Sequence, residues 1–219
     1  MNFSFGSMFT DKTKMVEEVD ALPGRDAPLD ISGIHHVSNH EMKPPFPDGL
    51  EVTYFALGCF WGAEKFFWKI DGVYVTAVGY QGGYTLNPTY EESCTAKTGH
   101  AEAVMVVFDP NVVSFKQLVT SFFEAHDPTQ YMGQGNDVGT EYRSAVFANS
   151  QGQFDTTQEV LAAYNKDLQA KGFGGITTEV TGVPAPPFYY AEEYHQQYLS
   201  KNPNGYCSLN GTGVSCSLS

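Results

Sequence analysis

One cysteine of the chain, Cys59, lies at a break between two regular patterns and could act as a nucleophile. The residues before it, 51–57, are rich in β-branched and aromatic types and predict a strand. Apolar residues after it recur at steps of three and four, which predicts a helix with one buried face. At the amino end of a helix, unpaired N–H groups and the helix dipole favour a thiolate, so this thiol should lose its proton readily. A buried structural cysteine in a strand-to-helix turn is the alternative.

Two further cysteines, Cys207 and Cys216, lie in a carboxyl-terminal segment without periodicity. Eight residues separate them, and two of these are glycines. A disulfide needs Cα atoms about 4.4–6.8 Å apart, and a glycine-rich loop of this length can close that distance. Because thiols that exchange disulfides must reach and retreat, we favour a redox role for this pair over an incidental one.

The composition limits the classes to which the protein can belong. Its 219 residues are enough for one domain with a sizeable core. The net charge of -13 and pI near 4.7 argue against nucleic acid or an anionic membrane as the main partner. No apolar run approaches the roughly 20 residues that cross a bilayer, and the amino-terminal sequence does not resemble a signal peptide. We therefore expect a cytoplasmic protein whose four cysteines rest as thiols, so that any disulfide is transient and catalytic.

Strand and helix patterns alternate from residue 51 onward and predict an α+β fold. The predicted elements are a strand at 51–57, a helix after Cys59, strands at 73–80 and 101–108, a helix at 114–126 and a strand at 142–148. This β-α-β-β-α-β order is that of the ferredoxin-like split arrangement, in which a mixed sheet carries its helices on one face. A helix at 153–170, a strand at 176–183 and a helix at 190–199 should follow.

Irregular segments flank the predicted catalytic domain, 51–200. Residues 1–50 contain five prolines and little periodicity, and we expect an extended arm that lies over the domain. Residues 201–219 are rich in turn formers, and we expect a flexible tail. Three histidines of the arm could suggest a metal site (His35, His36 and His40). No cysteine or carboxylate cluster stands at ligand spacing, so we expect packed or surface histidines and no metal.

Six segments from residue 51 onward resemble, in order, peptide methionine sulfoxide reductase A. They are GCFWGAE (58–64), GYQGGYTLNPTYEESC (79–94), TGHAEAV (98–104), GNDVGTEYRS (135–144), FYYAEEYHQQYL (188–199) and KNPNGYC (201–207). The amino-terminal DALPGRDAPL (20–29) resembles the longer bacterial members. The resemblance implies an enzyme that reduces methionine S-sulfoxide, free or in peptides, to repair oxidised proteins. Independently of the resemblance, we expect a monomer. It also implies thioredoxin as the reductant and no bound cofactor.

The resemblance assigns roles to residues around Cys59, which would attack the sulfoxide sulfur. Glu102, a carboxyl in an otherwise apolar strand, would supply the proton, since burial keeps such a group protonated near neutral pH. A surface-facing strand residue is the alternative interpretation of Glu102. Three side chains match positions that hold the sulfoxide oxygen by hydrogen bonds: Tyr90, Asp137 and Tyr142. Phe60 and Trp61, which we expect to be exposed rings, match the apolar pocket for the substrate's methyl group.

The resemblance also implies a redox cycle of three steps. Cys59 becomes a sulfenic acid as methionine leaves. Cys207 attacks that sulfur to form a disulfide, and Cys216 then attacks Cys207 and carries the disulfide to the exposed tail, where thioredoxin reduces it. Cys94 aligns with a cysteine outside this cycle and is assigned a packing role. The chain departs from the family pattern at Ser208, where glycine is usual, and in a longer segment before the last predicted helix, VPAPPFYY (183–190).

Two other functions fit parts of the sequence. A cysteine hydrolase or acyltransferase would pair Cys59 with a histidine such as His100, His126 or His195. No spacing favours one of these histidines, and such an enzyme needs no tail cysteines. A binding module rich in aromatic residues and glycine, for example for glycans, would not need Cys59. Loss of two thiols per product on adding a sulfoxide would distinguish a reductase from both.

Overall fold

A six-stranded mixed sheet forms the centre of the protein, for which the computed structural model describes residues 11–218. The strands lie in the order β7-β6-β1-β3-β2-β8. Their bounds are β1 Glu51–Leu57, β2 Val73–Gln81, β3 Ala101–Phe108, β6 Ser144–Phe147, β7 Glu179–Thr181 and β8 Phe188–Tyr190. The helices are α1 Phe60–Phe67, α2 Tyr90–Ser93, α3 Phe115–Ala125, α4 Gln151–Ala170 and α5 Tyr198–Lys201.

The four central strands confirm the predicted ferredoxin-like arrangement. β1 pairs antiparallel with both β3 and β6, and β3 pairs antiparallel with β2. The sheet is mixed, as predicted, because β7 joins β6 in parallel at one edge while β8 joins β2 antiparallel at the other. A second, two-stranded sheet joins β4 (Gly133–Gln134) to β5 (Asp137–Val138), and the short 3-10 helix η2 (Thr140–Tyr142) follows it.

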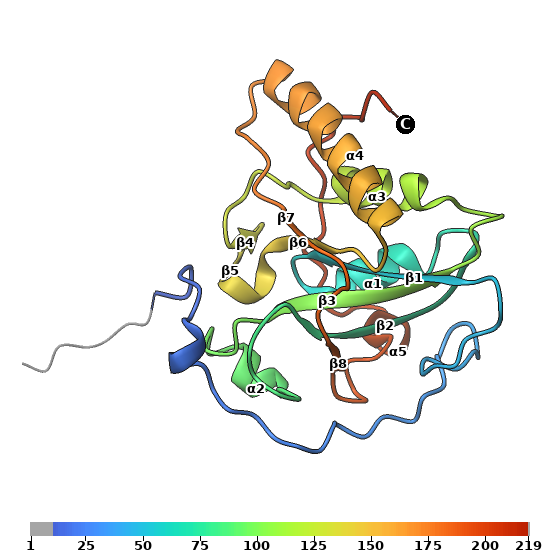
Figure 1. Ribbon diagram of the computed structural model, residues 1–219, viewed down its shortest axis with the longest axis vertical. Helices are drawn as coiled ribbons and strands as arrows, with labels where there is room; N and C mark the ends of the chain where they lie inside the picture. The colour runs from blue at the N-terminus through green and yellow to red at the C-terminus, as the bar shows by residue number, and fades with distance from the viewer. Residues whose placement is uncertain (1–10, 219) are drawn as a thin grey trace, which may run out of the picture.

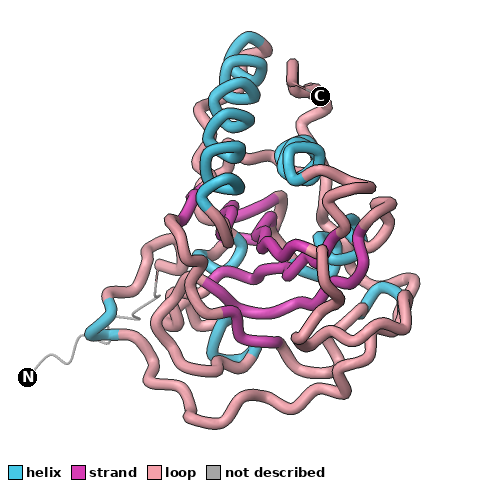
Figure 2. The backbone as a smooth tube through the Cα atoms, turned by 45° about the vertical axis from the view of Figure 1, so that its right-hand side comes forward, coloured by secondary structure: helices cyan, strands magenta, loops and turns pink. Residues whose placement is uncertain are grey.

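The two faces of the sheet are covered by different parts of the chain. Alternate side chains of β1 and β3, such as Phe55 and Val104, join the main core with α1, α3 and α4. The opposite face packs Val75 and Val107 against Ile31 and Met42 of the amino-terminal arm. Figure 1 shows α3 and α4 on one side of the sheet and the arm curving around the other, and Figure 2 shows the same layers. Ile31 and Met42 thus cover the face of the sheet opposite the helices.

The last predicted helix, 190–199, is wrong in its extent. Only Tyr198–Lys201 is helical, because Gln197 adopts left-handed backbone angles (φ 47°, ψ 41°). Contacts with a distant residue hold that conformation: the Gln197 backbone N–H and side-chain amide donate to the buried Glu64 carboxylate at 2.8 and 2.7 Å. The predicted strand at 176–183 is shorter, and 188–190, not predicted as a strand, pairs with the edge of β2.

The carboxyl-terminal tail has neither helix nor strand from residue 202 to 218, yet it packs on α3 and α4. The Tyr164 hydroxyl donates to the Val214 carbonyl at 2.9 Å, and the Cys216 N–H donates to Glu124 Oε1 at 2.7 Å. Cys216 is 2% exposed and belongs to the main core. The expected exposed position of Cys216 is therefore wrong, because its small apolar side chain fills space between two helices that are distant in sequence.

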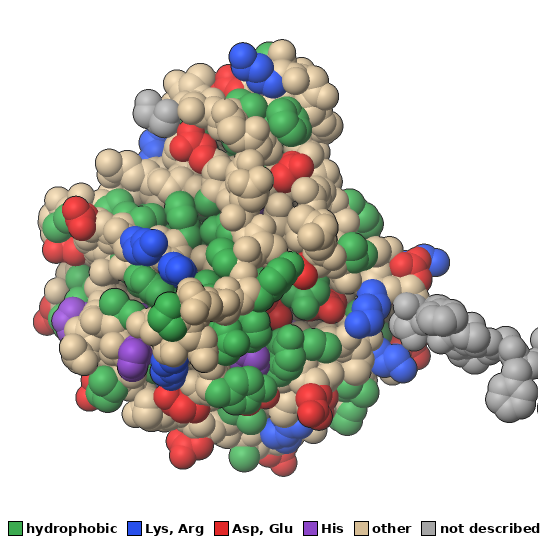
Figure 3. All heavy atoms as spheres, turned by 180° about the vertical axis from the view of Figure 1, so that it is seen from behind, with side chains coloured by type: hydrophobic (Ala, Val, Ile, Leu, Met, Phe, Trp, Pro, Cys, Tyr) green, Lys and Arg blue, Asp and Glu red, His purple; other side chains and the backbone are tan. Residues whose placement is uncertain are grey.

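The surface carries its charge in scattered positions. Figure 3 shows hydrophobic side chains gathered over the middle of one face, with Asp and Glu spread around them and not collected in one patch. No helix among residues 11–218 is long and apolar enough to cross a membrane.

Candidate active site

Cys59 lies between β1 and α1 because the chain makes a turn there that requires glycine. Gly58 has φ +91°, and a Cβ on it would lie 2.7 Å from Cβ of Gln134. The turn starts α1 with Cys59 as its N-cap, which agrees with the sequence prediction. The backbone N–H groups of Trp61 and Gly62 point at the Cys59 sulfur and favour its thiolate.

The expectation that the Cys59 thiol ionises easily is wrong. Burial first, and the charge of Glu102 second, raise its pKa to about 12, although the two N–H groups act in the opposite direction. A desolvated thiolate facing a carboxylate is unfavourable even at a helix N-terminus. The thiol therefore rests protonated, and it must lose its proton in the course of the reaction.

Glu102 lies in β3 with its side chain on the helical face of the sheet. It is 2% exposed, and its Oε2 accepts a hydrogen bond from the Phe60 N–H at 2.9 Å. Burial raises the pKa of Glu102 to about 8, against the effect of that N–H, and the charges of Glu141 and Asp137 add to the increase. Glu102 is consequently protonated at neutral pH and can donate a proton in the pocket. The surface-facing alternative is wrong.

A cavity of about 150 Å³ brings most of the predicted site residues together. It is lined by Cys59, Phe60, Trp61, Tyr90, Glu102, Asp137, Tyr142 and Tyr206. Its size admits a side chain but not a folded protein. Phe60 is only 1% exposed, so its expected exposure is wrong, whereas Trp61 is half-buried. Tyr206 was not predicted, although it directly precedes Cys207.

The aromatic wall of the cavity is fixed by residues that the sequence did not single out for this role. The Trp61 indole N–H donates to His195 Nδ1 at 3.0 Å, and the indole stacks on Tyr198 with ring centroids 3.9 Å apart. Burial lowers the pKa of His195 to about 4, so the ring is neutral and Nδ1 can accept. Both partners come from the segment 188–199, whose resemblance to the family was their only sequence signal.

The polar wall is made of hydroxyl groups that stay protonated. Burial raises the pKa of both Tyr90 and Tyr142, so each keeps an O–H to donate. The Tyr90 backbone is held from behind by Glu192, whose Oε1 accepts its N–H at 2.9 Å. Such donors suit the partially negative oxygen of a sulfoxide.

Asp137 is occupied by the tail in this structure. Its carboxylate accepts from Ser208 Oγ at 2.8 Å and from the Tyr206 hydroxyl at 3.2 Å. These two residues flank Cys207, so the contact holds that cysteine at the mouth of the cavity. The sequence assigned Asp137 only to substrate binding.

The structure brings Cys207, but not Cys216, to the first turn of α1. Cys207 is exposed, and a Cβ on Gly62 would lie 3.0 Å from its sulfur. Because the Gly62 N–H faces the Cys59 sulfur, both cysteines adjoin the same glycine. Cys94 is half-buried at the C-cap of α2, where its thiol raises the pKa of Tyr90.

The candidate histidines are bonded to groups other than the Cys59 sulfur, and His195 holds Trp61 in the cavity wall. His100 contacts Gly83 and Thr85, and His126 contacts Phe122 and Ser144. Of the arm histidines, His35 is buried and contacts Thr76, His36 is exposed and contacts Ser200, and His40 is half-buried and contacts the Tyr74 carbonyl. Within residues 11–218, no group of three or more His, Cys, Asp or Glu is arranged to hold a metal ion. Among the described residues, none of the three candidate histidines is hydrogen-bonded to the Cys59 sulfur, as the hydrolase alternative requires.

Comparisons with known proteins give a consistent result. A family model described as peptide methionine sulfoxide reductase matches residues 51–215. The peptide methionine sulfoxide reductase MsrA 1 of Synechocystis sp. is 55% identical over 214 residues, which cover 98% of this chain and 96% of that protein. The protein of the same name from Caulobacter vibrioides is 57% identical over 198 residues, 90% of each chain.

Solved structures agree with the sequence comparisons. Methionine sulfoxide reductase A of Corynebacterium diphtheriae superposes with a TM-score of 0.83 at 48% identity, covering 93% of this chain and 98% of that one. The reduced form of Mxr1 from Saccharomyces cerevisiae gives a TM-score of 0.66 at 35% identity, covering 74% and 91%.

Proposed function

The chain belongs to the peptide methionine sulfoxide reductase family, and from this premise we propose how its own residues reduce methionine sulfoxide, free or in proteins. The observation that carries the proposal is the placement of a half-buried thiol and a buried protonated carboxyl in one small cavity with an aromatic wall. A sulfur nucleophile and an acid are the two groups that removal of the sulfoxide oxygen requires. Repair of oxidised proteins is the corresponding role.

In the first step, the methyl group of the substrate packs on Phe60 and Trp61, and its oxygen accepts from the two tyrosine hydroxyls. The Cys59 thiol gives its proton to solvent, and its sulfur bonds to the sulfoxide sulfur as Glu102 protonates the oxygen. The resulting hydroxyl then moves from the substrate sulfur to the Cys59 sulfur, which breaks the S–O bond of the substrate and the new bond between the two sulfurs, and Glu102 regains its proton from solvent. The products are methionine and a Cys59 sulfenic acid, so the substrate sulfur is reduced by two electrons and Cys59 is oxidised by two.

In the second step, the Cys207 thiol attacks the Cys59 sulfur, which releases water and forms the Cys59–Cys207 disulfide. The contact of Cys207 with Gly62, beside the Cys59 sulfur, supports this pairing. In the third step, the Cys216 thiolate attacks the Cys207 sulfur and frees Cys59. This step requires Cys216 to leave its buried place on α3 and α4, since Cys207 lies beside α1.

The last step needs a dithiol that reaches the tail disulfide, and we assign it to thioredoxin. A cavity of about 150 Å³ excludes a folded protein, so a disulfide carried outside the cavity is the form that such a reductant can attack. A cycle that returns to free thiols suits a reducing compartment such as the cytoplasm.

The test compares three cysteine variants in a single-turnover assay of methionine formation. Cys59→Ser should form no methionine, since a hydroxyl is a much weaker nucleophile at sulfur. Cys207→Ser should form one methionine per chain and stop. Cys94→Ser, the matched control, should behave as wild type. Methionine formed by Cys59→Ser at near wild-type yield would rule out the proposed nucleophile.

A further inference from the structure

The amino-terminal arm holds the loop that carries Tyr90. Arg25 reaches over this loop with both ends of its guanidinium: Nη1 donates to the Asn87 carbonyl at 2.6 Å and Nη2 to Glu92 Oε1 at 2.9 Å. In return, the Asn87 side-chain amide donates to the Arg25 carbonyl at 2.8 Å. These contacts join residues more than 60 positions apart in the sequence.

Glu92 is the residue on which α2 depends. The helix has four residues, and one this short has little stability of its own. A capping box holds it: Glu92 Oε2 accepts from the Thr89 N–H at 2.9 Å, and the Thr89 hydroxyl accepts from the Glu92 N–H. Arg25 binds the other oxygen of the same carboxylate, so the arm fixes the cap of the helix that begins with Tyr90.

The arm backbone is fitted to the same loop. Gly24 forms a bridge with Leu86, where the Arg25 N–H donates to the Leu86 carbonyl at 3.0 Å. Gly24 has φ +73°, and a Cβ there would overlap the Leu86 carbonyl oxygen. Any larger residue at position 24 must therefore move the arm away from the loop.

The second tyrosine loop is tied to the same arm. The Thr140 N–H, at the start of η2, donates to the Lys12 carbonyl at 2.8 Å, and the Lys12 ammonium donates to the Cys94 carbonyl at 2.7 Å. Lys12 thus links η2, which carries Tyr142, to the end of α2. Both hydroxyl donors of the cavity come from segments that the arm braces.

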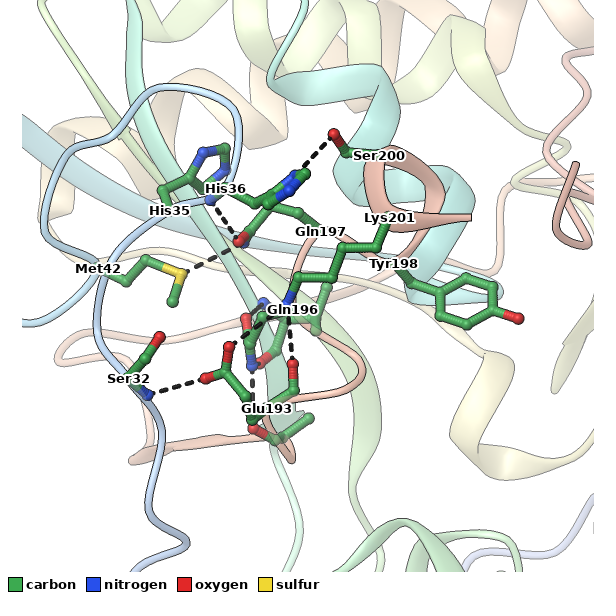
Figure 4. A network of polar contacts seen from close by, with 12 residues as sticks. Ser32, His35, His36, Met42, Glu193, Gln196, Gln197, Tyr198, Ser200 and Lys201 are labelled. Carbon is green, nitrogen blue, oxygen red and sulfur yellow. Dashed lines mark hydrogen bonds and ion pairs between the residues drawn. The ribbon is translucent and has the colours of Figure 1, made fainter. Parts of the chain in front are cut away.

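A later part of the arm braces the aromatic wall. The Ser32 N–H donates to Glu193 at 2.8 Å, and the His36 N–H donates to the Gln197 side chain at 3.0 Å. Figure 4 shows these arm residues next to the segment 193–201, which includes His195 and Tyr198. The arm therefore contacts three of the segments from which the cavity is built.

We propose that the amino-terminal arm is a positioning element of the substrate pocket, with Arg25 and Gly24 as the residues that set the place of Tyr90. None of the described arm residues lines the cavity; the arm acts through α2 and η2. This inference rests on the proposed function, since it concerns how that enzyme holds the sulfoxide oxygen.

The experiment measures single-turnover methionine formation over a range of methionine sulfoxide concentrations for the full chain. Arg25→Ala should raise the half-saturating concentration about fivefold, the weight of one hydrogen bond, with the limiting rate within about twofold of wild type. Arg25→Lys keeps the charge but cannot make both hydrogen bonds, so its half-saturating concentration should lie between those of wild type and Arg25→Ala. Gly24→Ala should raise the half-saturating concentration as Arg25→Ala does, through displacement of the arm.

Gly49→Ala is the matched control, because Gly49 is also an arm glycine with positive φ (+89°) but has nothing within 4 Å of a Cβ. It carries the same backbone strain without the contact and should bind substrate as wild type does. A second readout does not depend on activity: the amides of Ser93 and Cys94, bonded to Thr89 and Tyr90, should exchange hydrogen faster in Arg25→Ala and Gly24→Ala.

The outcomes separate the inference from its premise. Wild type that forms no methionine would refute the proposed function itself. Wild type that is active, with an unchanged half-saturating concentration in both arm variants, would overturn only the role of the arm. A lower limiting rate at an unchanged half-saturating concentration would also overturn it, because that pattern reports loss of folded enzyme and not a displaced Tyr90.

Discussion

Replacing Glu102 by Gln separates two effects that this carboxyl has on the reaction. Glutamine keeps the size of the side chain and can still accept from the Phe60 N–H, which lies 2.9 Å away, but it carries neither the proton nor the charge. If Glu102 is the acid, the chemical step should slow by about 10²–10⁴-fold. The charge of Glu102 also raises the pKa of Cys59, so the variant should have a more acidic thiol and yet be a slower enzyme.

The pH dependence follows from the two raised pKa values, about 8 for Glu102 and about 12 for Cys59. The reactive form has its proton on Glu102 and none on Cys59. Below pH 8 both groups hold protons, so the fraction of this form rises about tenfold per pH unit. Between pH 8 and 12 it stays constant, because each loss of the acid is matched by a gain of thiolate.

The assay is the second-order rate of methionine formation at low sulfoxide concentration, from pH 6 to 10. This rate, kcat/KM, reports the groups of the free enzyme. Wild type should show a rise that levels near pH 8. The Gln variant should be slower throughout and continue to rise past pH 8. Alkylation of Cys59 by iodoacetamide, followed by peptide mass spectrometry, gives the thiol pKa separately, and it should be lower in the variant.

Glu141→Gln is the matched control, since Glu141 is a buried carboxyl (2% exposed) with a pKa raised by burial, but it does not line the cavity. It should react within about threefold of wild type. A Glu102→Gln rate within that same factor, or a Cys59 thiol that becomes less acidic in this variant, would refute the assignment of Glu102.

Three further predictions concern the sulfur relay and the stability. Gly62→Ala should leave the first turnover unchanged but slow Cys59–Cys207 disulfide formation several-fold, because a Cβ would lie 3.0 Å from the Cys207 sulfur. Thiol loss after one turnover measures this. Gly152→Ala is the helical control, because a Cβ there would meet only Ser150 Oγ, at 4.0 Å, and an equal rate of disulfide formation in the two variants would contradict the prediction. Cys216→Ser should turn over with a small dithiol but slow markedly with thioredoxin, and equal loss with both reductants would assign it another role. The free energy of unfolding should fall as pH falls from 6.5 to 4.5, because four buried histidines have a folded pKa of about 4 and an unfolded value of 6.5: His35, His100, His126 and His195. The raised pKa values of two carboxyls, Glu64 and Glu102, act in the opposite direction, but two groups do not offset four. Urea unfolding that shows no loss of stability between pH 6.5 and 4.5 would refute this prediction.

The central strands and helices could be predicted because their apolar periodicity is local. Phe115–Ala125 was predicted within one residue at each end, and its boundary is set by a capping box that begins at Ser114. The position of Cys59 at the start of α1 could also be predicted from local sequence, because the strand pattern before it ends at a glycine and a helix pattern follows. Glu102 stood out as the only charged residue in a strand that is otherwise apolar.

The parts that sequence reasoning missed depend on contacts between distant segments. The helix expected before Tyr198 is absent because Gln197 bonds to Glu64, 133 positions away. The pKa of Cys59 is raised by burial and by Glu102, which only the folded chain brings together. The burial of Cys216 depends on α3 and α4, and a glycine-rich tail carries no pattern that reports where it will pack.

The most direct test of the central claim is the oxidation state of Cys59 after one turnover. Cys207→Ser is incubated with methionine sulfoxide in the absence of reductant, treated with a reagent that traps sulfenic acids, and examined by peptide mass spectrometry alongside the methionine formed. The account predicts one methionine per chain and one trapped sulfenic acid, located on Cys59. Methionine formed while Cys59 remains an unmodified thiol would contradict it.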